Sequence, residues 1–125
     1  MLQRLSMRKD DLVRMQHMLD AAKEAISFAW SRTRADLDSD RMLTLSIMKA
    51  IEIVGEAASK ASKECRDRFT EIPWSNIVGM RNRLIHVYFD INLDRLWDTV
   101  TDDLPPLAAT LERIISQEGE TQHTP

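Results

Sequence analysis

Four side chains within eight residues carry the strongest chemical signal in this chain: Arg81, Asn82, His86 and Tyr88. Arginine can neutralise a phosphate through paired hydrogen bonds, and histidine can move a proton near neutral pH. When RNA is cleaved by its own 2′-hydroxyl, the reaction needs a base, an acid and a cation for the charge that builds on phosphate. These residue types therefore suit RNA cleavage without a metal ion, and Asn82 would hold the imidazole or the phosphate.

The spacing of the four residues sets a geometric condition on that chemistry. On a continuous helix each residue turns by about 100° around the axis. The four polar side chains would then lie on one side of the helix, in the order Tyr88, Arg81, Asn82 and His86 around its circumference. Arg83 falls outside this group. Arg81 and His86 are about 140° apart, so one regular helix cannot aim both at one atom. A helix end near His86, or a second copy of the motif in a dimer, would remove the conflict.

The same residues also have a purely structural interpretation, and the spacing taken by itself favours it over catalysis. In it His86 sits at a helix end, Asn82 bonds the backbone and Arg81 forms a salt bridge. Glu52 and Glu56 lie four residues apart on an upstream helix. Such a pair can indicate a metal site or an acid–base pair, but salt bridges and solvated side chains are commoner. We expect Glu56 to pair with Arg81, and Glu56 and Arg83 to be supporting residues.

Apolar spacing predicts the helices that must position these residues. Steps of three and four residues predict a first helix over 7–34 and a second over 40–65, with a polar break at 36–40 between them. A third helix is expected over 75–87, with Ser75 as its N-cap.

A fourth helix is expected to open at its N-cap Asn92. The apolar spacing keeps its phase across Pro105-Pro106, so we expect a kink inside one element or a restart on nearly the same axis. The sequence predicts an all-α, up-and-down four-helix-type bundle over 1–115 and a polar, disordered tail over 116–125.

Composition narrows the functional classes. The formal net charge is −3, so any contact with RNA must come from a local cluster, for which the candidates are Arg66, Arg68, Arg81, Arg83 and Arg95. The single cysteine, Cys65, excludes an internal disulfide and a cysteine-based zinc site. No apolar run of about eighteen residues is present, and we expect a cytoplasmic protein without a metal or cofactor.

Several separated blocks of the sequence resemble the HepT-like HEPN proteins. The resemblance spans about residues 5–115, and its blocks are AIEIVGEAA at 50–58, IPWSNIVGMRNRLIHVYF at 72–89, LWDTV at 96–100 and DLPPL at 103–107. Matches in several blocks are more specific than the spacing of one arginine and one histidine. The motif positions Arg81, Asn82, His86 and Tyr88 are all intact.

The resemblance implies a compact helical bundle that forms a homodimer, with two arginine-x4-histidine motifs facing a shared cleft. It implies a metal-independent RNA endonuclease in which Arg81, Asn82 and His86 are catalytic and the substrate is mRNA or tRNA. It also implies a toxin of a type VII-like toxin–antitoxin pair. The expected antitoxin is an MNT-type nucleotidyltransferase that silences the toxin by adding AMP to Tyr88.

A second interpretation comes from a different class of protein. In this alternative the chain is a non-catalytic helical subunit that binds a minimal nucleotidyltransferase and assists it. Both interpretations share the fold and the partner. They differ in whether His86 performs chemistry.

Overall fold

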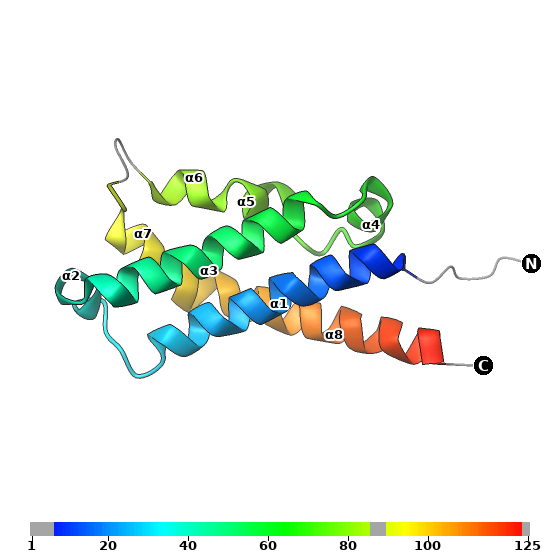
Figure 1. Ribbon diagram of the computed structural model, residues 1–125, viewed down its shortest axis with the longest axis horizontal. Helices are drawn as coiled ribbons and strands as arrows, with labels where there is room; N and C mark the ends of the chain where they lie inside the picture. Colours follow the sequence, from blue (N-terminus) through cyan, green and yellow to red (C-terminus); the bar gives the residue numbers. More distant parts are fainter. Residues whose placement is uncertain (1–6, 86–89, 124–125) are drawn as a thin grey trace, which may run out of the picture.

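The computed structural model describes residues 7–85 and 90–123, and over those ranges the chain is helical. Its elements are α1 (Lys9–Ala29), α2 (Asp36–Ser39), α3 (Arg41–Ser59), α4 (Lys63–Arg68), α5 (Trp74–Val78), α6 (Met80–Leu84), α7 (Leu93–Asp98), the π-helical turn η2 (Thr99–Asp103) and α8 (Leu104–His123). Successive long segments reverse direction (Figure 1). The predicted all-α, up-and-down bundle is therefore confirmed.

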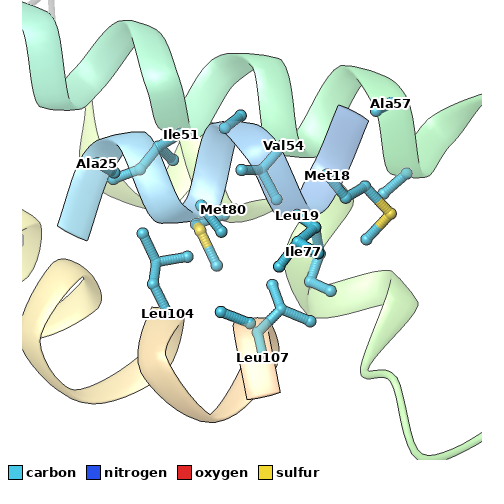
Figure 2. Close-up of a cluster of buried hydrophobic side chains, with 14 of the residues drawn as sticks. Met18, Leu19, Ala25, Ile51, Val54, Ala57, Ile77, Met80, Leu104 and Leu107 are labelled. Carbon is cyan, nitrogen blue, oxygen red and sulfur yellow. The ribbon is translucent and has the colours of Figure 1, made fainter. Parts of the chain in front are cut away.

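The core lies where α1, α3 and α8 meet, and α5 and α6 close it on one side. Each helix contributes the apolar stripe that its sequence spacing predicts, for example Met15, Leu19 and Ala22 on α1. Figure 2 shows side chains from all these helices in one cluster, including Met18, Val54, Ile77, Met80, Leu104 and Leu107. This packing fixes α5 and α6 on the bundle, and α6 carries the first residues of the motif.

The first two predicted helices are both shorter than expected. α1 stops at Ala29, and the predicted polar break contains the short helix α2. The second predicted helix divides at Ser62, whose hydroxyl accepts a hydrogen bond from the Cys65 backbone and starts α4. Asp11 of α1 accepts hydrogen bonds from both the backbone N–H and the hydroxyl of Ser62, at 2.8 and 2.6 Å. A tertiary contact from α1 therefore fixes this division.

The third predicted helix is also divided and ends early. α5 and α6 meet at Gly79, and α6 ends at Leu84, three residues before the predicted end. Ser75 is not the N-cap, since Pro73 occupies that position and makes no side-chain capping bond. By contrast, Asn92 caps α7 as predicted, and its side chain accepts a hydrogen bond from the Arg95 backbone.

The last predicted helix is divided into α7, η2 and α8, which follow one another without a loop, so the chain stays helical through its two prolines. The π turn η2 directly precedes α8, so Pro105 and Pro106 fall in the first turn of α8, where their missing N–H groups cost little. A π turn is a recognised cause of an irregular helix axis. The predicted disorder after residue 115 is wrong for 116–123, because α8 continues through His123. Glu118, in this segment, is fully buried.

Candidate active site

The short helix α6 presents the first half of the motif to solvent. Met80 and Leu84 are buried and anchor the helix, whereas Arg81, Asn82 and Arg83 are exposed. After Leu84 the backbone is extended at Ile85, which forms an isolated antiparallel bridge with Ile91. These contacts fix both ends of the segment that carries the second half of the motif.

The predicted helical geometry therefore holds for only part of the motif. Because α6 ends at Leu84, helical angles can be projected from Arg81 only that far, short of His86 and Tyr88. Both of these residues lie outside the described residues. Of the two expected solutions, a helix end near His86 or a second copy of the motif, the first has support, because α6 ends at Leu84.

Arg81 and Asn82 line an open groove of about 460 Å³ between α3 and the α5–α6 connection. The other lining residues are Glu52, Gly55, Glu56, Ser59 and Val78. Gly55 lets the helices approach closely, since a Cβ on it would lie 3.2 Å from the Ile77 carbonyl oxygen. The three polar residues of α3 in the groove repeat at helical spacing, and this is the signal that identifies Ser59 as a lining residue.

Glu52, and not Glu56, is the partner of Arg81. The Arg81 Nε donates to Glu52 Oε1 at 2.5 Å, and Lys49 lies 3.9 Å from the other carboxylate oxygen. Glu56 instead pairs with Lys60 at 3.7 Å. The predicted Glu56–Arg81 pair is therefore wrong by one helical turn, although Glu56 lines the same groove. Because Glu52 takes only Nε, the two terminal nitrogens of Arg81 can still contact an oxyanion.

The candidate arginines do not form one cluster. Arg83 donates to the Asn76 carbonyl oxygen and, with Arg95, lines a different pocket that also contains Asp98 and Asp103. Arg68 is held by the buried carboxylate of Glu118. The prediction that Arg83 faces away from Arg81 and Asn82 is confirmed. The predicted basic cluster is divided over separate surfaces.

Other reactive groups are remote from the groove or absent from the described part of the chain. Cys65 is buried, and burial raises the pKa of its thiol to about 12. Among residues 7–85 and 90–123, no group of three or more histidines, cysteines or acidic residues is placed to hold a metal ion. Within the same ranges, no helix is long and apolar enough to cross a membrane.

Comparison with known proteins gives one consistent result. The model of the family described as "Ribonuclease HepT-like" matches residues 18–114. The chain is 32% identical over 104 residues to "Putative RNase TTE0752" of Caldanaerobacter subterraneus, covering 83% of this chain and 93% of that protein. It is 33% identical over 100 residues to "Probable ribonuclease HepT" of Thermococcus cleftensis, covering 77% of this chain and 91% of that protein. No solved structure matches the chain significantly.

Proposed function

Because the chain belongs to the HepT-like ribonuclease family, we propose that it is a metal-independent RNA endonuclease and the toxin of a toxin–antitoxin pair. The observation that carries the proposal is the groove in which Arg81 and Asn82 stand side by side, with the terminal nitrogens of Arg81 available to an oxyanion. That arrangement suits a phosphate whose charge rises during cleavage.

In the proposed reaction the RNA supplies its own nucleophile. The 2′-hydroxyl loses its proton to a base and its oxygen bonds to phosphorus, while the bond from phosphorus to the 5′-oxygen breaks and that oxygen gains a proton. The products are a 2′,3′-cyclic phosphate and a 5′-hydroxyl. His86 moves protons, Arg81 stabilises the phosphorane charge and Asn82 positions the phosphate or the imidazole.

We propose that the working site is composite and lies at a homodimer cleft. One reaction needs both a base and an acid, and each chain supplies one His86. The surface at the groove is suited to a symmetric contact, since the exposed apolar residue Val78 of α5 lines the groove with Arg81, and exposed Ile53 adjoins the lining residue Glu52 in α3. Two copies related by a two-fold axis would bring two motifs to one RNA strand.

The proposed antitoxin is an MNT-type nucleotidyltransferase that transfers AMP to Tyr88. An AMP group adds a phosphate ester, which would compete for Arg81 with the RNA backbone and would also block the groove sterically. The residues on either side of the segment that carries Tyr88 meet at the end of α6, where the Asn92 N–H donates to the Leu84 carbonyl oxygen at 2.7 Å. Modification of this segment would silence the enzyme without unfolding the bundle.

Induction in cells tests the proposed toxicity. Wild type should arrest growth and leave cleaved cellular RNA, whereas His86→Ala at equal soluble expression should do neither. RNA sequencing of cleavage ends and a growth curve are the measurements. Equal arrest by both proteins would favour the non-catalytic helical subunit.

Co-expression with the proposed MNT-type nucleotidyltransferase tests the regulation. Wild type should gain the mass of one AMP on the peptide that contains Tyr88, and growth should recover. Tyr88→Phe keeps the ring but lacks the acceptor oxygen, so it should stay toxic and unmodified. If Tyr88→Phe is silenced as well as wild type, simple binding by the antitoxin is the better explanation.

A further inference from the structure

A further open pocket, of about 270 Å³, lies where α4 is followed by α5. We call it the Arg66 pocket, and its lining residues are Arg66, Thr70, Pro73, Trp74, Ser75 and Asn76. Its polar side chains are a guanidinium, two hydroxyls and an amide, and all of these can donate hydrogen bonds. No carboxylate is among the described residues that line it, so the pocket favours an anion.

The acidic residues that flank the pocket in sequence are already neutralised. Asp67 lies 2.6 Å from Lys63, and Glu71 lies 3.0 Å from Arg113. Arg66 differs from these residues, because its side chain forms no hydrogen bond or ion pair within residues 7–85 and 90–123. The guanidinium of Arg66 is therefore available to a ligand.

The pocket lies next to the candidate active site along the chain. α4, α5 and α6 follow one another along one side of α3 (Figure 1). Ser75 and Asn76 of α5 line the Arg66 pocket, whereas Val78 of the same short helix lines the Arg81 groove. The two sites therefore share the short helix α5.

From this arrangement we infer that the Arg66 pocket binds a backbone phosphate of the RNA strand whose cleavage we propose at the Arg81 groove. The inference rests on that proposed function. It accounts for how a chain of net charge −3 holds a polyanion, since affinity comes from a few placed donors and not from the overall field. The pocket contacts backbone and not bases, because Trp74 is buried and its indole N–H donates to the Phe69 carbonyl oxygen at 3.0 Å.

The test measures binding separately from chemistry. The probe is a single-stranded RNA of about sixteen nucleotides with 2′-O-methyl riboses, which cannot supply the nucleophile. Fluorescence anisotropy gives the dissociation constant over a range of salt concentrations for wild type, Arg66→Ala, Asn76→Ala and Arg41→Ala. Arg41 is the matched control, because it is exposed and opens α3 at the other end of the bundle (Figure 1).

Arg66→Ala should weaken binding about tenfold at about 0.1 M salt, as loss of a charged hydrogen bond typically does. It should also lower the slope of log affinity against log salt by about 0.7, the value for one phosphate contact on a single strand. Asn76→Ala should weaken binding about threefold without changing the slope, because it removes a neutral donor. Arg41→Ala should change neither quantity beyond error.

Three outcomes would overturn the inference. The first is an equal loss of RNA affinity in Arg66→Ala and Arg41→Ala, and the second is no loss in either variant. The third comes from a parallel titration with polyglutamate, if Arg66→Ala loses affinity for polyglutamate but not for RNA. The first would mean a general charge effect, and the last a site for an acidic protein. Circular dichroism melts check that the variants fold. If wild type binds the probe through Arg66 but never cleaves unmodified RNA, the proposed function fails while the phosphate site stands.

Discussion

At the scale of single residues, Glu52 determines how Arg81 is presented to the groove. The pair is only partly buried, with 44% of the Arg81 side chain and 29% of the Glu52 side chain exposed. A pair this exposed typically contributes less than about 1 kcal/mol to stability. The main effect of the pair is on the orientation of Arg81, because a hydrogen bond at Nε restricts rotation of the guanidinium and so fixes the direction of its terminal nitrogens.

Glu52→Gln tests this positioning role. The amide keeps the shape and one acceptor oxygen but loses the charge that holds Arg81. We expect kcat for RNA cleavage to fall about tenfold or more, while KM changes little, because misplacement of a catalytic group lowers the rate of the chemical step. Glu56→Gln is the matched control, since Glu56 pairs with Lys60. Equal kcat values for the two variants would contradict the role.

A comparison of Arg81 with Arg83 distinguishes an arginine that stabilises the transition state from one that only adds positive charge to the surface. Arg81→Ala should cost about 3 kcal/mol of transition-state stabilisation, as loss of a preorganised donor does. Arg83 lines another pocket, so Arg83→Ala should cost less than about 1 kcal/mol, by the usual size of a partly screened charge effect. The measurement is kcat/KM on one RNA substrate. Similar losses would indicate a diffuse basic surface.

At the scale of elements, sequence patterns located the helices better than their ends. Apolar spacing predicted α1, α3 and α8, because each buries one continuous stripe. The break at Ser62 was not predictable, since Asp11 makes it through a contact 51 residues away in the chain. For the site, Arg81 and Asn82 lie in one groove, as their helical spacing predicts, but the acidic partner of Arg81 is Glu52 and not the predicted Glu56. Both Glu52 and Glu56 fit helical spacing, and only the docking of α6 on α3 distinguishes them.

The end of α8 was misjudged for a related reason. Residues 116–118 are polar, yet Glu118 is fully buried and accepts hydrogen bonds from Arg68 of α4 and from the Met7 backbone, the latter at 3.1 Å. A polar residue with satisfied partners can be buried, and composition alone does not reveal such partners. The contact ties α8 to α4 and to the start of the described chain.

Glu118→Ala should therefore destabilise the fold by about 2 kcal/mol, because it removes the buried carboxylate that accepts hydrogen bonds from the Met7 N–H and the Arg68 guanidinium. Glu112→Ala is the control on the same helix, since Glu112 forms an exposed pair with Lys23 and should cost less than about 1 kcal/mol. Urea unfolding at one protein concentration gives both free energies. A cost for Glu118→Ala no larger than that of Glu112→Ala would show that the buried contact is not stabilising.

At the scale of the whole molecule, one chain leaves its candidate site open. The groove is a surface feature with carboxylates on its α3 side. The composite model needs a second copy of the chain to complete the site. The exposed apolar residue Val78 of the groove, and exposed Ile53 next to the groove residue Glu52 in α3, suit that contact. Sedimentation at micromolar concentration should give twice the mass of 14.4 kDa. Ile53→Glu should then lower both the mass and the RNA cleavage rate, whereas a monomeric wild type would remove the composite model.

The most direct test of the central claim is cleavage of one defined RNA by purified protein in excess EDTA. Wild type should cut the RNA and leave a 2′,3′-cyclic phosphate, detected by mass spectrometry, and His86→Ala should be inactive with an unchanged circular dichroism spectrum. The same RNA with a single 2′-deoxyribose at the cut position should resist cleavage there. Loss of wild-type activity in EDTA, cleavage at the 2′-deoxy position, or full activity in His86→Ala would contradict a metal-independent ribonuclease that uses His86.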